Sequence, residues 1–118
     1  MLPNLVALEE YLDDQGDSPF GAWFEALDAQ AAAKVTVALS RIERGAVSNV
    51  KGVGEGVSEF KIDFGPGYRV YFGRDGEKLV ILLGGGTKRR QDDDIADAKA
   101  RWSNYKARKK AAAKKGDA

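Results

Sequence analysis

The side chains available for chemistry are Lys, Arg, Tyr, Asp and Glu, because the 118 residues include no histidine and no cysteine. The absence of cysteine excludes thiol nucleophiles, disulfides and sulfur-ligated zinc, and the absence of histidine removes the usual acid/base group at neutral pH. The remaining types can stabilise negative charge and transfer protons without a cofactor. They gather at alternating positions in one short stretch, as Glu59, Lys61, Asp63, Arg69 and Tyr71. We expect the candidate site there, with no metal.

A tight β-hairpin would place this cluster on one face of a sheet. Residues 59–64 alternate polar and apolar side chains, and the following Gly-Pro-Gly supplies the permissive and the fixed φ that a reversal needs. If those three residues form the loop, Asp63 faces Arg69 and Lys61 faces Tyr71. The other face must pack in the core; it carries Phe60, Ile62, Phe64, Tyr68, Val70 and Phe72. The polar face would then be the solvent-facing side.

A third strand is predicted at residues 78–83, because Asp75-Gly76 is a strong hairpin signal. Its uninterrupted apolar run suits a central strand that is covered on both faces. A two-residue loop would place Val80 and Leu82 beneath the charged face as an apolar floor, whereas a three-residue loop would turn them to the opposite face. The next three glycines read as a turn, either a plain one or one that contacts phosphate.

Two helices are predicted before the hairpin. Ser18 and Pro19 have the types of an N-cap and a first helical residue, and the apolar residues that follow have helical spacing: Phe20, Trp23, Phe24 and Leu27. Asp28 can cap a second helix at residues 29–44, which the next glycine would end. The two helices should form a helical hairpin.

The rest of the chain has weaker signals. Residues 5–11 are expected to form a first strand, and residues 46–56 read as a flexible connection because three glycines interrupt any periodic pattern. A last helix should start near Gln91. We expect one domain at residues 1–107 and a basic, frayed tail at residues 108–118, where no apolar stripe remains.

Charge is unevenly distributed although the net charge is only +1. Up to Thr87 the chain has 8 basic and 13 acidic residues, and after it 11 basic and 5 acidic. Such asymmetry is typical of a basic surface for an anionic partner, and a solvated helix with a polar tail produces the same count. The first residues include neither a basic region nor a long apolar run. These features predict a cytoplasmic protein without a membrane partner.

Four segments together resemble the RelE/ParE superfamily of bacterial type II toxin-antitoxin toxins, and more closely its HigB-like branch of addiction module killer proteins: SPFGAWFEALD, GVGEGVSEFKIDFGPGYRVYFGRDG, LLGGGTK and QDDDIADAKARW. The resemblance implies a compact α+β domain with an N-terminal strand and helix hairpin, a three-stranded antiparallel meander and a C-terminal helix. It also implies a toxin that cuts messenger RNA in the ribosome without a metal and so inhibits translation. The expected partners are a cognate antitoxin, the ribosome and messenger RNA.

Other members of the superfamily leave alternatives open. ParE-like toxins inhibit DNA gyrase by binding, and a degenerate toxin would bind only its antitoxin. The ribonuclease hypothesis depends on basic residues that match the family pattern. Lys61 matches a position on the first strand of the meander and Arg69 one on the second. Arg89, or Lys88 if the alignment slips by one, matches the arginine after the sheet.

On this resemblance, Lys61, Arg69 and Arg89 would hold the scissile phosphate, and Glu59 would take the proton of the ribose 2′-hydroxyl. RNA contacts are assigned to Lys88 and Tyr71. Two positions depart from the family pattern. Asp63 stands where a second basic residue is expected, and Ile95 lies near the position of a helical tyrosine. These departures leave open a different cleavage geometry, or no cleavage.

Overall fold

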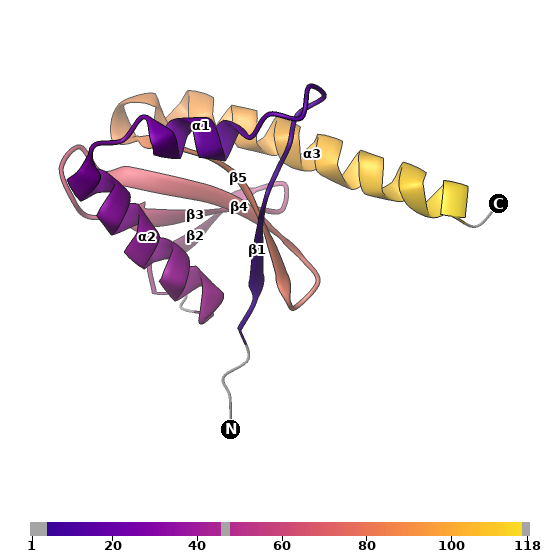
Figure 1. Cartoon of the computed structure of the whole chain (residues 1–118), viewed down its shortest axis with the longest axis horizontal. Coiled ribbons are helices and arrows are strands. Elements are labelled where there is room, and N and C mark those ends of the chain that lie inside the picture. The colour runs from indigo at the N-terminus through magenta and orange to yellow at the C-terminus, as the bar shows by residue number, and fades with distance from the viewer. Residues whose placement is uncertain (1–4, 46–47, 117–118) are drawn as a thin grey trace.

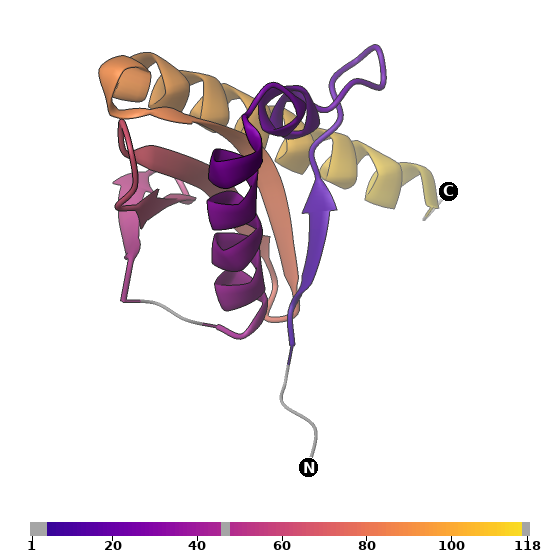
Figure 2. The ribbon, with the colours of Figure 1, turned by 60° about the vertical axis from the view of Figure 1, so that its left-hand side comes forward.

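A five-stranded sheet separates two layers of helix (Figures 1 and 2). The structure, a computed structural model, describes residues 5–45 and 48–116. Helices α1 (Pro19–Glu25) and α2 (Ala29–Glu43) pack on one face of the sheet, and α3 (Gln91–Gly116) lies along the other. A short 3-10 helix, η1 (Lys88–Arg90), leads into α3. The sheet therefore has a separate apolar core on each side.

The strands are β1 (Ala7–Glu10), β2 (Val50–Gly54), β3 (Val57–Ile62), β4 (Tyr68–Asp75) and β5 (Leu79–Thr87), in the spatial order β1-β5-β4-β3-β2. The last three strands form an antiparallel meander, and β1 pairs with β5 in parallel. The predicted α+β class is confirmed, with the strand, helix hairpin, meander and final helix in the expected order. β5 is a central strand, as its apolar run predicted.

The helix starts also match the sequence signals. The Ser18 hydroxyl accepts a hydrogen bond of 2.9 Å from the Gly21 amide, and Pro19 is the first residue of α1. The Asp28 carboxylate accepts one of 2.8 Å from the Ala31 amide at the start of α2. The apolar stripes of these helices pack on the face of the sheet opposite to α3, where Phe20 and Val35 are buried.

The hairpin between β3 and β4 has the predicted faces and a different register. Lys61 pairs with Arg69, where Tyr71 was expected, because the loop spans residues 63–67. The Phe64 amide donates to the Ile62 carbonyl and the Gly67 amide to the Phe64 carbonyl, both at 3.0 Å, which closes the chain into a longer turn. Each partner shifts by two residues, and a shift of two leaves every side chain on its original face.

The segment before β3 is not the flexible connection that its glycines indicated. β2 pairs with β3 in antiparallel fashion, and the two strands are joined by Glu55 and Gly56 with φ of 56° and 83°. Two positive φ values are the requirement of a type I′ turn, whose twist suits a hairpin. Gly52 and Gly54 concealed the strand because they interrupt the alternation. Residues 46–47 of the predicted connection lie outside the described residues.

The turn between β4 and β5 has the three-residue form. Asp75 pairs with Leu79, so Val80 and Leu82 pack with Phe72 on the side of α1 and α2. Of the two alternatives, the three-residue loop is therefore the one present, and Val80 and Leu82 do not form a floor beneath the charged face. Ile81 and Leu83 lie on the α3 side instead. A bulge follows, where Phe72 pairs with Leu82 and Tyr71 with Gly84.

The three glycines expected to form a turn continue β5 as strand up to Thr87. They make room for side chains on both faces of the sheet. A Cβ on Gly85 would overlap the indole of Trp23 from α1, and one on Gly86 would overlap the Asp94 carboxylate from α3. On β4, a Cβ on Gly73 would lie 2.6 Å from the indole of Trp102. These glycines allow the helices to lie close to the sheet.

We expect Gly85→Ala to lower the free energy of unfolding by about 1 to 3 kcal/mol, because the added methyl group forces Trp23 out of its place. Gly52→Ala is the matched control, since a Cβ there meets no atom within 4 Å. Urea unfolding followed by tryptophan fluorescence measures both variants. Equal midpoints for the two variants would contradict the packing role and favour a plain glycine turn.

Candidate functional site

Two rows of paired residues cross the face of the sheet that lies toward α3. In the first row Lys51 of β2 pairs with Glu59 of β3, which pairs with Tyr71 of β4. In the second row Lys61 pairs with Arg69. Directly paired residues of antiparallel strands point to the same face, so all five side chains share it. The candidate site residues of β3 and β4 are thus brought together as predicted.

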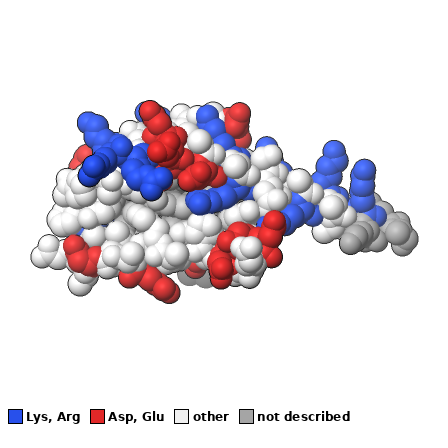
Figure 3. Space-filling view, turned by 90° about the horizontal axis from the view of Figure 1, so that it is seen from above, with Lys and Arg blue, Asp and Glu red and all other residues white. Residues whose placement is uncertain are grey.

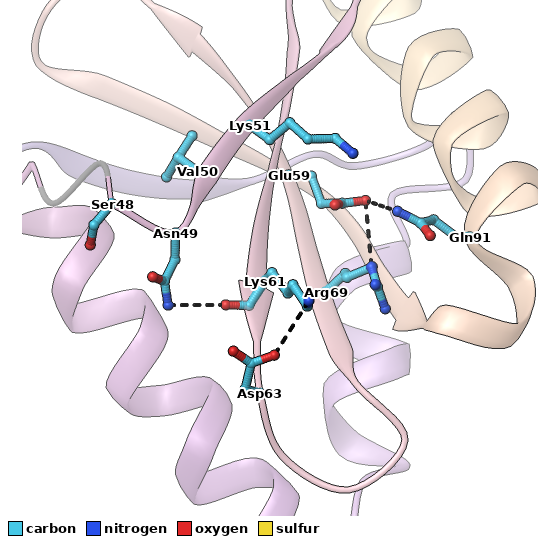
Figure 4. Close-up of a pocket in the computed structure, with 9 residues that line it drawn as sticks. All are labelled: Ser48, Asn49, Val50, Lys51, Glu59, Lys61, Asp63, Arg69 and Gln91. Carbon is cyan, nitrogen blue, oxygen red and sulfur yellow. Dashed lines mark hydrogen bonds and ion pairs between the residues drawn. The ribbon is translucent and has the colours of Figure 1, made fainter.

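A pocket of about 430 Å³ opens over these rows where β2 forms the edge of the sheet (Figure 4). Its lining comes from β2 and the residues before it, from β3 and β4, and from the first residue of α3. The lining residues are Ser48, Asn49, Val50, Lys51, Glu59, Lys61, Asp63, Arg69 and Gln91. The pocket therefore combines three cationic side chains with two carboxylates.

Arg69 forms the floor of the pocket and is only 4% exposed. Its Nη1 donates a hydrogen bond of 2.8 Å to the Gly67 carbonyl, and its Nε lies 3.7 Å from Oε2 of Glu59. Nε is buried and has no hydrogen-bond partner among the described residues. Buried polar groups are usually paired, and exceptions concentrate at functional sites. The guanidinium is thus held in one orientation, with Nε facing the Glu59 carboxylate.

Glu59 is the buried carboxylate beside Arg69, with 3% of its surface exposed. Nε2 of Gln91 donates a hydrogen bond of 2.9 Å to its Oε2 (Figure 4). A buried charge is tolerated only when other groups compensate it, and here a guanidinium and an amide do so from two sides. Gln91 is the first residue of α3, so the start of this helix positions the carboxylate. No sequence signal indicated that role.

Tyr71 lies deeper still and is fully buried among Ile81, Leu83 and Trp102. Its ring therefore offers no surface to a nucleotide, and the expected direct contact with RNA does not fit its position. The Tyr71 hydroxyl lies close to the Glu59 carboxylate but forms no hydrogen bond of ordinary geometry among the described residues. Burial, followed by the negative charge of nearby Glu59, raises the pKa of Tyr71. The phenol stays protonated at neutral pH beneath the pocket.

Lys61 and Asp63 stand at the mouth of the pocket. Their side chains are 54% and 83% exposed, and their charged groups lie 3.5 Å apart. An ion pair this exposed contributes little to stability because water screens it. Asp63 follows the last residue of β3 and belongs to the loop. Lys61 is therefore a cation that can exchange this partner for a ligand at little cost.

Lys88 and Arg89 lie in η1 and are exposed. They line a separate hollow at the start of α3 together with Arg90, Gln91, Asp92 and Asp93. The structure does not bring them into the first pocket, and only Gln91 belongs to both. One backbone link connects the regions, because the Lys88 amide donates to the same Gly67 carbonyl that binds Arg69.

Five of the nine pocket residues were not predicted from the sequence, and Lys51 and Gln91 are the two of these that bear on the charges of the pocket. Lys51 was hidden because its segment was read as a loop. The available signal was the pair Glu55-Gly56, since two residues of this kind between short segments can close a hairpin. Gln91 was recognised only as the start of a helix. No local pattern connects it with Glu59, which lies 32 residues earlier.

Residues 22–113 match the family model described as phage derived protein Gp49-like (DUF891). The chain belongs to the Gp49-like family. This is a toxin-like family of toxin-antitoxin systems, so the broader part of the resemblance is confirmed and an antitoxin is the partner that the family suggests. A protein from Haemophilus influenzae (strain ATCC 51907 / DSM 11121 / KW20 / Rd), described as an uncharacterized protein, is 42% identical over 81 residues, which are 68% of this chain and 82% of that protein.

The Gp49-like match spans the whole pocket, from Ser48 to Gln91. Membership of the HigB-like branch stays a prediction. Over residues 5–45 and 48–116, the Gp49-like chain has no helix with the length and apolarity needed to cross a membrane.

We expect Tyr71→Phe to leave the stability at pH 7 within about 1 kcal/mol of the parent protein, because it removes a buried hydroxyl that forms no hydrogen bond of ordinary geometry. Above pH 10 the variant should lose less stability than the parent. Tyr71 ionises near its ordinary pKa of 10.0 in the unfolded chain but at a higher pH in the folded one. Its contribution is present below pH 10 and is lost as the pH rises towards the folded pKa.

Urea unfolding between pH 7 and pH 11 measures this difference. Tyr105→Phe is the comparison, because the Tyr105 hydroxyl donates a hydrogen bond of 2.6 Å to Asp75. That variant should lose about 0.5 to 1.5 kcal/mol already at pH 7. A large loss in Tyr71→Phe at pH 7 would show that its hydroxyl has a partner after all.

Proposed function

We propose that this Gp49-like protein is the toxin of a toxin-antitoxin module and acts as an endoribonuclease on messenger RNA at the ribosome. The observation that carries the proposal is Arg69, a guanidinium held in one orientation by the Gly67 carbonyl and the Glu59 carboxylate at the floor of an open pocket. Preoriented donors of this kind stabilise charge that develops in a transition state, and they do so most strongly away from water. A phosphate diester is the anionic group that suits such a floor.

The chemistry follows from the order of groups in the pocket. Arg69 from below and Lys61 from the rim bind the non-bridging oxygens of the scissile phosphate. Glu59 takes the proton of the 2′-hydroxyl, whose oxygen attacks the phosphorus. The bond from phosphorus to the 5′-oxygen breaks, the leaving oxygen takes a proton from water, and the hydroxide formed takes the proton from Glu59, which restores the carboxylate. The products are a 2′,3′-cyclic phosphate and a free 5′-hydroxyl.

The other predicted site residues take different places in this proposal. Tyr71 supports the floor beneath Glu59 and does not touch RNA. Lys88 and Arg89 bind the backbone of the flanking nucleotides from their exposed position beside the pocket. The ribosome presents the messenger RNA, and this places the activity in the cytoplasm. An antitoxin would neutralise the protein by covering the pocket.

We expect Lys61→Ala to reduce RNA cleavage about 100-fold, because it removes one group that stabilises the transition state. Its stability should change little, since the side chain is 54% exposed and its ion pair with Asp63 is screened by water. Lys78→Ala is the control. This lysine is also exposed and lies in the β4–β5 turn, at the end of the hairpin away from residues 63–67.

The measurement combines two readings in the same cells. Parent, Lys61→Ala and Lys78→Ala proteins are induced, messenger RNA ends are mapped, and plasmid supercoiling is followed. New ends within translated frames for parent and Lys78→Ala, and few for Lys61→Ala, support the proposal. Intact messages with relaxed or broken DNA would instead favour a gyrase inhibitor.

The basic end of α3 has a different expected role. The helix continues through the predicted boundary at residue 108 as far as Gly116. Nη1 of Arg108 donates a hydrogen bond of 2.6 Å to the Leu12 carbonyl, and its Nη2 lies 2.7 Å from the Asp14 carboxylate. Beyond these contacts the helix extends away from the body, and basic side chains follow its projecting end in Figure 3.

We expect Lys110→Ala combined with Lys114→Ala to weaken RNA binding without lowering cleavage at saturating protein. Both side chains are exposed on the projecting helix, where they attract RNA but cannot reach the pocket. The slope of log affinity against log salt should fall by about 1.4, at about 0.7 for each charge lost. A salt series of binding and single-turnover cleavage test this; a lost saturated rate would place these lysines in the site.

A further inference from the structure

We infer that Lys51 of β2 is the second phosphate-binding cation of the pocket. In the RelE/ParE pattern that this chain resembles, a basic residue is expected at position 63, where this chain has Asp63. Lys51 takes over the role of that residue. The inference rests on the proposed function, because it assumes that an RNA phosphate enters the pocket. It adds a strand and a residue that the sequence pattern did not include.

The charges of the pocket single out Lys51. Arg69 lies 3.7 Å from the Glu59 carboxylate, and Lys61 lies 3.5 Å from the Asp63 carboxylate. Each of these cations therefore has an acidic neighbour. No carboxylate of the described residues lies within 4.0 Å of the Lys51 ammonium. The excess positive charge that faces an incoming anion is thus the charge of Lys51.

Register brings this charge to the correct face. Lys51 pairs with Glu59, and Glu59 lies two residues from Lys61 on the same strand. The two lysines therefore project from neighbouring strands on the same side, about 7 Å apart along the strand direction. Figure 4 shows the Lys51 side chain extending from β2 toward the side of the pocket where Glu59 meets Gln91. A phosphate above Arg69 would lie between the two ammonium groups.

Position 63 cannot supply this contact in the same way. β3 ends at Ile62, so Asp63 belongs to the loop and its side chain is 83% exposed. Lys51 belongs to a strand that is hydrogen-bonded to β3 and closed by the turn at Glu55 and Gly56. A residue on a paired strand is held more rigidly than one in a loop, and rigid positioning favours binding. β2 therefore compensates for the acidic residue in the loop.

The first test is binding, which does not require cleavage. The probe is a fluorescent ten-nucleotide RNA with 2′-O-methyl groups, which lacks the attacking hydroxyl. By fluorescence anisotropy, Lys51→Ala should bind about tenfold more weakly than the parent, and its salt slope should fall by about 0.7. Lys51→Arg should keep most of the affinity. Lys78→Ala should bind like the parent, and thermal melting should show that all variants are folded.

Rescue provides the second test. Lys51→Ala combined with Asp63→Lys restores a cation at position 63, and we expect it to recover part of the lost affinity and of RNA cleavage, because a loop residue holds the cation less rigidly than β2 does. A folded Lys51→Ala protein that binds the probe like the parent overturns the inference. No rescue by Asp63→Lys overturns the claim that Lys51 replaces position 63.

The same measurements separate this inference from the ribonuclease proposal. If the parent protein binds the probe through Lys51 but cuts no RNA, the proposed reaction fails and the phosphate contact of Lys51 stands. If RNA is cut normally by Lys51→Ala, the ribonuclease stands and the inference fails. If the parent does not bind the probe at all, the inference fails as well.

Discussion

The close approach of α3 to the sheet is the constraint on which the site depends. It is allowed by positions that lack a side chain. Trp102 lies over Gly73, Arg101 lies over Gly84, and Asp94 lies over Gly86, and a Cβ on any of these glycines would meet the atoms above it. Nη1 of Arg101 also donates a hydrogen bond of 3.0 Å to the Leu83 carbonyl, which fixes the helix along β5. Larger residues at these positions of β4 and β5 would push α3 away from the sheet and expose the apolar core between the helix and the sheet to water.

This approach changes the character of the polar face. Without the helix, Glu59 and Arg69 would be exposed neighbours on adjacent strands, and their ion pair would contribute little to stability. Under the helix they are 3% and 4% exposed, so their charges interact with little screening and must compensate each other. Removing one partner would leave the other charge buried and unpaired, and this would lower the free energy of unfolding by about 3 to 5 kcal/mol. Arg69 therefore serves both the fold and the proposed chemistry, whereas the exposed lysines serve the chemistry alone.

The pocket opens where this cover ends. α3 begins at Gln91, and β2 is the last strand of the sheet, so the outer end of the two rows has no helix above it. The buried polar atoms without a hydrogen bond among the described residues, Nε of Arg69 and the hydroxyl of Tyr71, lie next to this end, beneath the helix. Well-packed domains satisfy nearly all of their buried polar groups, and departures from that rule concentrate where a protein binds or reacts. The unsatisfied groups and the open edge thus point to one region of the molecule.

Sequence alone was enough for the features that neighbouring residues control. The caps at Ser18 and Asp28, the alternation in residues 59–64 and the turn after Asp75 predicted the helix starts, the two faces of β3 and β4, and a meander whose last strand, β5, is interior to the sheet. Each of these signals acts over a few residues, because capping, pleating and turn formation are local. The faces survived an error in register, since a shift of two residues keeps side chains on the same side.

Only the tertiary structure decided which polar residues are buried and which are open. Strand pairing turned the glycine-rich segment into β2 and so brought Lys51 to the pocket. The helix that covers Glu59, Arg69 and Tyr71 begins 20 or more residues after them in the chain. Its distance from the sheet depends on glycines of β4 and β5. No local pattern carries that information, because burial results from packing between segments that are far apart in the sequence.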